Sequence, residues 1–451
     1  MKADTLDIDW RSVRDEATEL LRQYIRIDTT NPPGGEQAGA EFLRERLDAD
    51  GIASTLYEAA PGRVSIAARL PRVVASELRP IVLLSHIDVV PAEPEHWQVD
   101  PFAGELIDGV IWGRGALDMK GMAVMELLAT VLAKRLDLPL ERDIVFLAVA
   151  DEEEGGEFGI RYLAREHPEL LEADVVLNEG AYGFREFMGR PVKMFAVGPS
   201  EKSPCWLRLV ARGRPGHASV PHGDNAVERL VAALARISAA ERRKRVSAPV
   251  EAMLRTLATE GFLPADLDPT AEEVVEMLAS ADGHLAAVTS DTINLTSLRA
   301  GGKHNVIPAS AEATLDCRLL PGTNPDEFVA ELERLIDDSS IEIVRVLEHV
   351  SGESSLDAPP VAAIRDVVAA TYGEDGMVLP VLSPGFTDSH AFRAAGVPAY
   401  GFIPALLTRE ELATIHGHNE RISQENLELG TRILFEVVRR LACPRAWEAT
   451  R

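Results

Sequence analysis

Four consecutive acidic residues follow an apolar run in the segment DIVFLAVADEEEGG, residues 143–156. The apolar run has the pattern of a strand that is buried on both faces, as in a parallel sheet. Like charges at the end of such a strand repel one another unless a cation lies among them. An isolated acidic run is more often a solvated turn. The rest of the chain has to distinguish these two interpretations.

Histidines and further acids follow other predicted strands in the same way. His86 and Asp88 lie two residues apart in SHIDVVP, and this spacing puts both side chains on one face of an extended chain. Asp118 lies in a glycine-rich turn before a predicted helix, and Glu179 ends another strand. Open α/β sheets bind ligands at the C-terminal ends of their strands. We therefore expect these side chains to converge in one crevice, with His416 added from TIHGHNERIS.

The residue types indicate a metal centre. Carboxylates with a few imidazoles and no thiolates suit zinc or a similar first-row cation. Two cations would need this many ligands, and a carboxylate can bridge cations that lie about 3.5–4 Å apart. Two dications would also neutralise the acidic run. One acid that does not bind metal could act as general base toward a water whose pKa the metal lowers to about 7.

Composition and charge restrict the class of protein. A chain of 451 residues is expected to form two or more domains. The net charge of −26 argues against nucleic acids and anionic membranes as partners. The 3 cysteines lie far apart and form no CxxC motif, which fits a reducing cytoplasm. We see neither a signal-peptide pattern nor an apolar stretch of about eighteen residues, so we predict a cytoplasmic protein without a membrane span.

The hydrophobic pattern divides the chain into two kinds of region. Before residue 200 and again after 353, apolar runs alternate with helical patterns, which predicts an α/β domain with a mainly parallel sheet. The segment between them reads β-α-β-β-α-β, the order of a ferredoxin-like module, with a charged, helix-prone insertion at 240–285. We therefore expect a discontinuous catalytic domain, residues 1–200 and 353–451, interrupted by a smaller domain, residues 201–352.

Individual elements can be bounded from the same pattern. The predicted strands are 64–70, 81–90, 143–150, 173–180, 202–213, 291–299, 311–319 and 341–348. The predicted helices are 9–27, 119–135, 159–166, 224–239 and 325–337. The segment TTNPPGG, residues 29–35, ends the first helix because proline and paired glycines cannot continue it.

The motifs SHIDVVP, GRGALDMKG, DEEEGG, NEG, GHAS-P, GGKHNVIP and IHGHNER occur in an order and spacing that one known family shares. The chain resembles the dizinc exopeptidase and amidohydrolase family of aminoacylase, acetylornithine deacetylase, succinyl-diaminopimelate desuccinylase and glutamate carboxypeptidase. This resemblance covers roughly residues 12–440. It implies a catalytic domain of the zinc-exopeptidase type with an inserted lid or dimerisation domain.

The resemblance implies two zinc ions per chain, with cobalt or manganese as possible replacements. The implied metal ligands are His86, Asp118, Glu153, Glu179 and His416. Asp118 would bridge the two ions. His86 and Glu179 would complete one metal site, and the other two residues would complete the second. In this family the peptide bond after the bridging aspartate is cis, which implies a cis bond between Asp118 and Met119.

Two further acids have implied roles beside the metals. Glu152 resembles the general base, and Asp88 resembles the acid that orients His86 through its other ring nitrogen. Many relatives have two glutamates before the glycines, whereas this chain has three. Alignment from the strand side gives the roles above. Alignment from the glycines would instead make Glu153 the base and Glu154 the ligand.

The inserted domain carries a second group of residues. His217 resembles a lid histidine that stabilises the oxyanion of the tetrahedral intermediate. Asn305 and Arg318 match positions that bind the carboxylate of the substrate. Thr387 belongs to a segment resembling a glycine-rich substrate loop, in which Phe386 replaces the second glycine. In dimeric relatives the lid histidine and asparagine come from the partner subunit, so we expect a homodimer.

These assignments predict a zinc-dependent amidohydrolase that cuts an amide bond next to a free carboxylate. Its substrate would be an N-acyl amino acid or a small peptide, as for a deacylase, a dipeptidase or a carboxypeptidase. One alternative is a metal-dependent binding module that has lost the chemistry, although such a module would need neither Glu152 nor His217. A second alternative is a metallophosphoesterase, although Asn305 and Arg318 suit a planar carboxylate better.

For three residues near the motifs, the sequence leaves two possible roles open. His390 could touch the substrate or pack inside the protein. His418 could lie beside the metal ligands or on the surface. Glu420 could orient His416 or be solvated.

Overall fold

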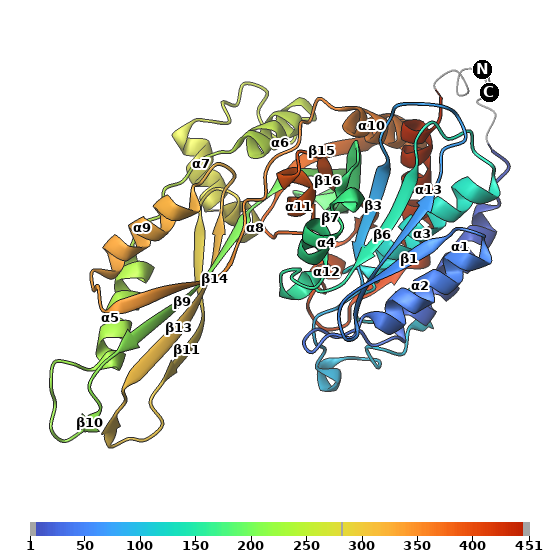
Figure 1. Cartoon of the computed structure of the whole chain (residues 1–451). Coiled ribbons are helices and arrows are strands. Elements are labelled where there is room, and N and C mark those ends of the chain that lie inside the picture. Colours follow the sequence, from blue (N-terminus) through green and yellow to red (C-terminus); the bar gives the residue numbers. More distant parts are fainter. Residues whose placement is uncertain (1–5, 281–282, 445–451) are drawn as a thin grey trace. The chain divides into compact units, whose positions relative to one another are not determined.

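The computed structural model describes residues 6–280 and 283–444. The first five residues, on which the prediction about a signal peptide partly depends, lie outside the described residues. The chain divides into two compact units (Figure 1). Unit 1 consists of Met1–Pro199, Glu353–Val381 and Thr387–Arg451, and unit 2 consists of Ser200–Gly352 and Leu382–Phe386.

Unit 1 contains an eight-stranded sheet with the strand order β1-β2-β6-β3-β7-β16-β8-β15. Its central strands β6, β3, β7 and β16 are parallel neighbours, and β1, β2 and β8 pair antiparallel at the sides. Every residue of β3 and β6 is buried, as predicted for strands covered on both faces. The strand bounds are Ser54–Ala60 (β1), Arg63–Leu70 (β2), Ile81–His86 (β3), Ile144–Val149 (β6), Val175–Phe187 (β7), Arg190–Glu201 (β8), Gly376–Ser383 (β15) and Ala399–Leu407 (β16).

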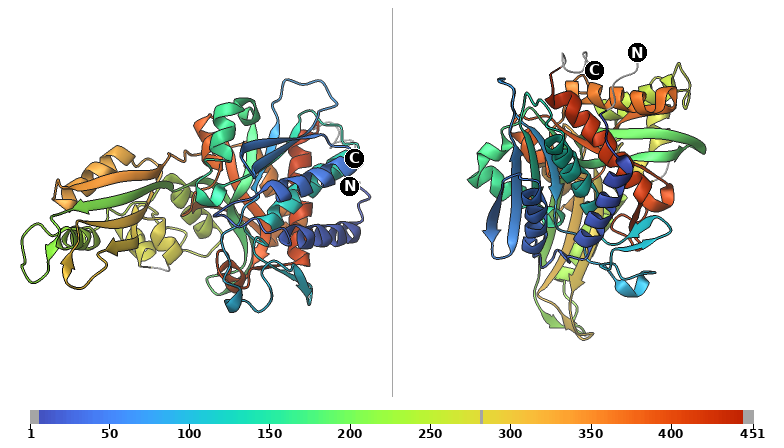
Figure 2. Two further views of the ribbon diagram at one scale, coloured as in Figure 1. Left: turned by 60° about the horizontal axis from the view of Figure 1, so that its bottom comes forward. Right: turned by 90° about the vertical axis from the view of Figure 1, so that its right-hand side faces the viewer.

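Helices cover both faces of this sheet (Figure 1, Figure 2). One face shares a hydrophobic core with α1 (Trp10–Ile25), α2 (Gln37–Ala49), α3 (Lys120–Arg135), α10 (Pro359–Tyr372) and α13 (Gln424–Ala442). The other face packs against α4 (Ile160–Glu166) and α11 (Ser389–Ala394). All residues of α3 up to Ala133 are buried, which agrees with its apolar sequence on every side. Within the described residues, no helix combines the length and the apolar character that crossing a membrane requires.

Unit 2 contains a four-stranded antiparallel sheet with the order β11-β13-β9-β14. Helices α5 (Ala226–Ala239) and α9 (Pro325–Ile336) share one hydrophobic core with the sheet. Side chains of β13 alternate between buried apolar and partly exposed polar positions, so only one face of the sheet is covered. The chain order β9-α5-β11-β13-α9-β14 is the predicted ferredoxin-like order. The strand bounds are Ser203–Arg212 (β9), Thr292–Ala300 (β11), Ser310–Leu319 (β13) and Ile341–Glu348 (β14).

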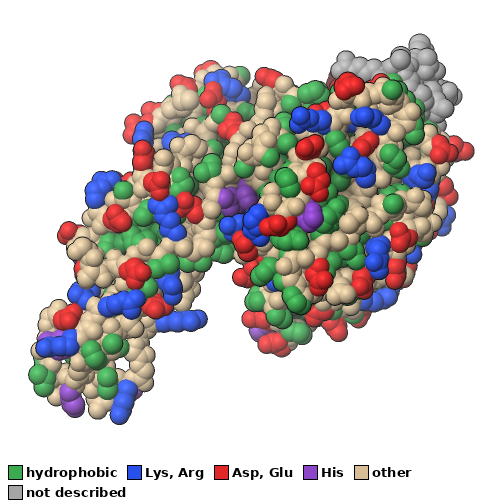
Figure 3. Space-filling view, in the orientation of Figure 1, with side chains coloured by type: hydrophobic (Ala, Val, Ile, Leu, Met, Phe, Trp, Pro, Cys, Tyr) green, Lys and Arg blue, Asp and Glu red, His purple; other side chains and the backbone are tan. Residues whose placement is uncertain are grey.

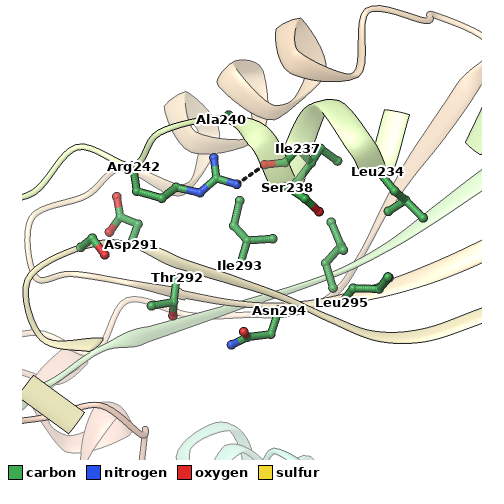
Figure 4. Close-up of a pocket in the computed structure, with 12 residues that line it drawn as sticks. Leu234, Ile237, Ser238, Ala240, Arg242, Asp291, Thr292, Ile293, Asn294 and Leu295 are labelled. Carbon is green, nitrogen blue, oxygen red and sulfur yellow. Dashed lines mark hydrogen bonds between the residues drawn. The ribbon is translucent and has the colours of Figure 1, made fainter. Parts of the chain in front are cut away.

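The predicted insertion in unit 2 forms helices α6 (Ala248–Thr259) and α7 (Glu272–Ala279) and leaves the edge strand β11 open. Leu295 and Leu298 of β11 are 48% and 51% exposed. A hollow of about 340 Å³ runs along this edge, between β11 and the C-terminal end of α5. Figure 4 shows Ile293 and Leu295 facing Ile237 of α5 across it, with Arg242 donating a hydrogen bond to the backbone oxygen of Ile237 (2.7 Å).

The chain leaves unit 1 after Pro199 and returns to it at Glu353. The backbone N–H of Ser354 donates to the carbonyl oxygen of Pro199 at 2.8 Å. The points of departure and return in unit 1 therefore lie side by side.

Candidate metal centre

The five predicted ligands come from strands of the central sheet and from loops in unit 1. They are His86 at the end of β3, Asp118 in the turn before α3, Glu153 in a 3-10 turn after β6, Glu179 in β7 and His416 in the loop before β17 (Arg421–Ser423). The strands β3, β6 and β7 are parallel neighbours. Glu179 does not end its strand as expected, because β7 continues to Phe187. The register Leu83↔Leu177 nevertheless places Glu179 level with the C-terminal end of β3, the edge at which such folds bind ligands.

Asp118 lies at the centre of this cluster. Its Oδ1 is 3.1 Å from Nε2 of His86, and its Oδ2 is 3.1 Å from Nε2 of His416. His86 Nε2 is also 3.6 Å from Glu179 Oε1, and His416 Nε2 is 3.2 Å from Glu153 Oε2. The Asp118–Met119 peptide bond is cis, as the resemblance implies. Each carboxylate oxygen of Asp118 thus faces a different histidine and a different acid.

The donor atoms fit divalent cations. Two groups have ligand atoms within 4.8 Å of one another: His86 with Glu152 and Glu179, and His86 with Asp118 and Glu153. The Oε1 atom of Glu153 is buried without a hydrogen-bond partner among the described residues, so it has a free lone pair inside the cluster. Imidazole and carboxylate donors without thiolates suit zinc, cobalt or manganese.

Electrostatics also favour positive charge at this position. Burial, followed by repulsion from Glu179, raises the pKa of Glu152 well above its usual value. Burial and the nearby Asp118 raise the pKa of Glu179 in the same way. Contacts with Asp118 and then Glu153 raise the pKa of His416 to about 11. The cluster therefore concentrates more negative charge than a buried site tolerates, and cations would relieve it.

The four acids of the run point in different directions. Asp151 has a left-handed backbone (φ 70°) and turns the chain after β6. Glu152 is buried beside His86 and Glu179, whereas Glu153 faces Asp118 and His416. The side chain of Glu154 is exposed. This geometry favours the alignment from the strand side, in which Glu154 has no role at the metals.

Asp88 touches His86 differently from the expected contact. The nearest partner of the His86 Nδ1 atom is the backbone oxygen of Asp88 (2.9 Å), while the Asp88 carboxylate is 3.5 Å away. The carboxylate instead accepts hydrogen bonds from the backbone N–H groups of Glu152 (3.1 Å) and Glu153 (3.2 Å). Asp88 therefore fixes the acidic turn as well as the histidine.

Glu420 takes neither of the two positions that the sequence left open. It is fully buried and accepts hydrogen bonds from the Arg114 side chain (2.6 Å) and from the backbone N–H groups of Leu117 (2.7 Å) and Asp118 (3.0 Å). It thus holds the turn that carries Asp118 rather than His416. No local sequence pattern indicates this contact, because Glu420 and Asp118 are 302 positions apart in the chain.

In unit 2, two predicted residues lie together at one end of the long sheet. Strand β10 (Gly216–His217) pairs with β12 (Val306–Ile307), and the backbone N–H of Ala218 donates to the backbone carbonyl oxygen of Asn305 (3.1 Å). We call this region, residues 213–223 and 301–309, the tip. His217 and Asn305 are both exposed, and Figure 3 shows histidine and basic side chains gathered at this end of the unit.

Arg318 lies at the opposite end of unit 2. The strand β13 begins at Ser310, beside the tip, and at about 3.3 Å per residue Arg318 lies roughly 26 Å further along it. The guanidinium forms two hydrogen bonds to Asp316 (2.7 and 2.9 Å) and lies 4.8 Å from the ring centroid of Phe386. The structure therefore brings His217 and Asn305 together but keeps Arg318 away from them.

Thr387 and His390 lie inside unit 1. The Thr387 hydroxyl accepts hydrogen bonds from the Asn178 amide (3.3 Å) and from the backbone N–H of Ser389 (3.2 Å). His390 is buried, with Nδ1 at 3.0 Å from the Thr387 carbonyl oxygen, and burial lowers its pKa to about 4. His390 therefore packs within the protein, and a substrate contact for Thr387 stays a prediction.

Comparisons with known proteins identify the family and the fold. A model of peptidase family M20/M25/M40 matches residues 82–440. Aminoacylase-1 of Sus scrofa is 31% identical over 430 residues, which cover 94% of each chain. The M20 family metallo-carboxypeptidase Sso-CP2 of Sulfolobus solfataricus gives a TM-score of 0.73 at 22% identity, covering 94% of this chain and 99% of that one. The Bacillus subtilis protein YXEP, a dinuclear metal binding peptidase, gives a TM-score of 0.61 at 14% identity, and the match covers 96% of this chain and 98% of that one.

Proposed function

Because the chain belongs to peptidase family M20/M25/M40 and is a hydrolase acting on amide bonds, we propose that it cleaves the amide bond next to a free carboxylate. Its substrate is an N-acyl amino acid or a small peptide. The observation that carries the proposal is Asp118 between two histidines, with one acid of the run on each side of it. This arrangement supports a site for two cations rather than one.

The ligands divide around Asp118. His86 and Glu179 would hold one divalent cation, Glu153 and His416 would hold the other, and Asp118, which lies between the two histidines, would serve both sites. When bound, such a pair supplies the positive charge that polarises a carbonyl group and acidifies water. The metal is zinc in this proposal, and the same donors accept cobalt or manganese.

The remaining residues of the chain supply proton transfer and hydrogen bonds. Glu152 accepts a proton from the attacking water at its carboxylate and returns that proton to the nitrogen of the leaving amine. His217 donates a hydrogen bond to the oxygen that becomes negative in the tetrahedral intermediate.

Arg318 and Asn305 bind the carboxylate of the substrate. The Nε and Nη2 atoms of Arg318 are used by Asp316, which leaves its Nη1 side for a second carboxylate. A planar fork of this kind favours a carboxylate over a tetrahedral phosphate, which weighs against phosphoester hydrolysis. A binding module without catalysis would need no buried acid in the position of Glu152.

We further propose that two copies share their sites. A dipeptide spans about 7 Å, far less than the roughly 26 Å of strand between the tip and Arg318. One substrate therefore cannot touch His217 and Arg318 of the same chain through unit 2 alone. In this proposal the tip acts in the site of a partner, and the open edge of β11 is the surface on which two copies pair.

A release assay tests the proposal. Purified protein loaded with zinc, cobalt or manganese is incubated with a panel of N-acyl amino acids and dipeptides, and the free amine is quantified. We expect hydrolysis of substrates with a free carboxylate and little hydrolysis of their methyl esters or amides. A parallel phosphate-release assay covers phosphoesters. Phosphate release without amine release would contradict the proposal, as would equal rates for acids and their amides.

A further inference from the structure

The acidic turn after β6 is held from the side that faces away from the metal ligands. Asp151, the first acid of the run, is buried and has no place among the ligands. Its Oδ1 accepts hydrogen bonds from Arg63 Nη2 (2.5 Å) and Asn31 Nδ2 (3.0 Å), and its Oδ2 accepts one from the backbone N–H of Phe158 (2.9 Å). Both oxygens of Asp151 are therefore used to fix the turn.

Asn31 links this carboxylate to the ligand layer. Its single amide nitrogen donates to Asp151 and also to the Asp88 carboxylate (2.9 Å). Asp88 in turn accepts the backbone N–H groups of Glu152 and Glu153. A continuous series of hydrogen bonds thus joins Arg63 to the two residues that face the two metal positions.

Arg63 lies at the start of β2 and is the only cation in this series. Besides Asp151, its guanidinium forms hydrogen bonds to both oxygens of Glu36, which is fully buried (2.8–3.2 Å). It also lies 5.0 Å from the ring centroid of Phe158. One arginine therefore forms ion pairs with two buried carboxylates, and removing it would leave both without a cationic partner.

The segment TTNPPGG provides the space for this arginine. It supplies Asn31, and its Gly34 has a positive φ of 81°. A Cβ atom at Gly34 would overlap the Arg63 guanidinium. The segment that ends the first helix in the sequence thus has a second role, which is to seat the arginine behind the acidic turn.

We propose that Arg63 is a positioning residue of the metal centre, acting through Asp151 and Asn31. The left-handed turn at Asp151 sends Glu152 and Glu153 to two different metal positions, so a small shift of this turn changes both at once. Residues that orient ligands from behind typically change metal affinity or activity by about 10–100-fold. The inference rests on the proposed function only where catalysis is the readout, because metal binding is measured separately.

Four variants test the proposal. Arg63→Met removes the cation, and Arg63→Lys keeps the charge but loses the planar fork. Arg63→Met combined with Glu36→Gln removes one buried charge of each sign, which protects the fold if the single variant unfolds. Arg69→Met is the matched control, since Arg69 lies on the same strand and pairs with Asp143 at the surface (2.7 Å).

Each variant is titrated with Co²⁺ against a chelator, and the visible absorption of the bound ion, the thermal unfolding of the metal-free protein and the steady-state kinetics are recorded. We expect both Arg63→Met proteins to bind Co²⁺ about 10–100-fold more weakly and with an altered spectrum. In both, kcat should fall while KM changes little. For Arg63→Lys, the Co²⁺ affinity and kcat should lie between those of Arg63→Met and the wild type. Arg69→Met should match the wild type in both.

The double variant decides between positioning and simple stability. If it unfolds near the wild-type temperature but still binds Co²⁺ weakly with an altered spectrum, Arg63 positions the ligands. Wild-type affinity and spectrum in the folded double variant would overturn the proposal and leave an ordinary structural ion pair. An inactive wild type with tight Co²⁺ binding would contradict the proposed function and leave this inference intact.

Discussion

The ligand cluster of unit 1 and the tip of unit 2 carry the two halves of the proposed chemistry, but they are organised in opposite ways. His86 and Asp118 face each other, and buried acids hold the turns that carry Asp118 and Glu152 through backbone N–H groups. His217 and Asn305 are exposed, and the ring of His217 contacts the hydroxyl of its near neighbour Ser219 (2.7 Å). The proposed ligands thus all come from one chain, whereas in our proposal the tip acts in the site of a second copy.

The largest expected effect belongs to the preorganised region. Glu152→Gln keeps the size of the side chain but cannot transfer a proton, so turnover should fall by about 10²–10⁴-fold while metal content stays the same. Glu154→Gln, an exposed neighbour in the same run, is the control and should remain active. An active Glu152→Gln protein beside a dead, metal-loaded Glu153→Gln protein would establish the alignment from the glycines instead.

The next effect tests the tip. His217→Ala should lower kcat by about 10²–10³-fold, the usual cost of losing one oxyanion donor. Metal content and unfolding temperature should stay unchanged, because the side chain is exposed. His304→Ala, also exposed at the tip, is the matched control. A loss of metal in His217→Ala would show that the tip and the ligand cluster are not independent.

Subunit exchange sharpens the same comparison. A mixture of Glu152→Gln and His217→Ala proteins should regain activity, since each mixed dimer holds one site with an intact base and an intact tip. Exchange itself is followed by a size or affinity tag on one variant. Continued inactivity after demonstrated exchange would mean that His217 acts within its own chain or has no role in turnover.

A smaller effect concerns a buried acid outside the ligand cluster. Burial raises the pKa of Glu126 in α3 well above its usual value. The folded protein therefore keeps a proton that the unfolded chain loses above about pH 4.5, so this group's contribution to stability falls as the pH rises. Glu126→Gln should remove this pH dependence of stability. Between pH 5 and 8 its free energy of unfolding should exceed that of the wild type by roughly 1–3 kcal/mol. Urea unfolding at several pH values measures this free energy, with Asp366→Asn at the exposed surface as control.

The smallest effect asks whether the two units unfold separately. Asn324 caps α9 in unit 2, where its side chain accepts hydrogen bonds from the backbone N–H groups of Asp326 and Glu327. Asn324→Ala should cost about 1 kcal/mol of stability and leave metal binding unchanged. Hydrogen exchange that rises in unit 2 alone would indicate independent units, while a uniform rise would indicate one cooperative transition.

Local pattern was enough to predict most of the elements that position the site. The expected helix 119–135 is observed as Lys120–Arg135, and the expected strand 143–150 as Ile144–Val149. The strand expected at 81–90 ends earlier, at His86, because the chain then turns so that Asp88 can face the acidic turn. Hydrophobic periodicity reports burial along the chain, and it cannot report where a backbone bends to satisfy a distant partner.

Local sequence pattern likewise predicts some residues of the candidate site and not others. The convergence of the proposed ligands was predictable because histidines and acids near several strand ends point to one place in an α/β fold. The contacts of Arg63 and Asn31 were missed, and Glu420 was given other roles, because each has its partner far away in the sequence. A single polar residue is ordinarily solvated. The arrangement of the tip was predictable only as a motif, since nothing local to His217 indicates that Asn305 lies beside it.

The hydrogen bond between Ser354 and Pro199 has a consequence for how such a protein can be remodelled. The segment Ser200–Gly352 begins and ends at neighbouring points, so a short turn could join Pro199 to Glu353 in its absence. All five proposed ligands belong to unit 1 and would remain. The greater part of unit 2 is therefore a single insertion that protein engineering could replace without changing those five residues.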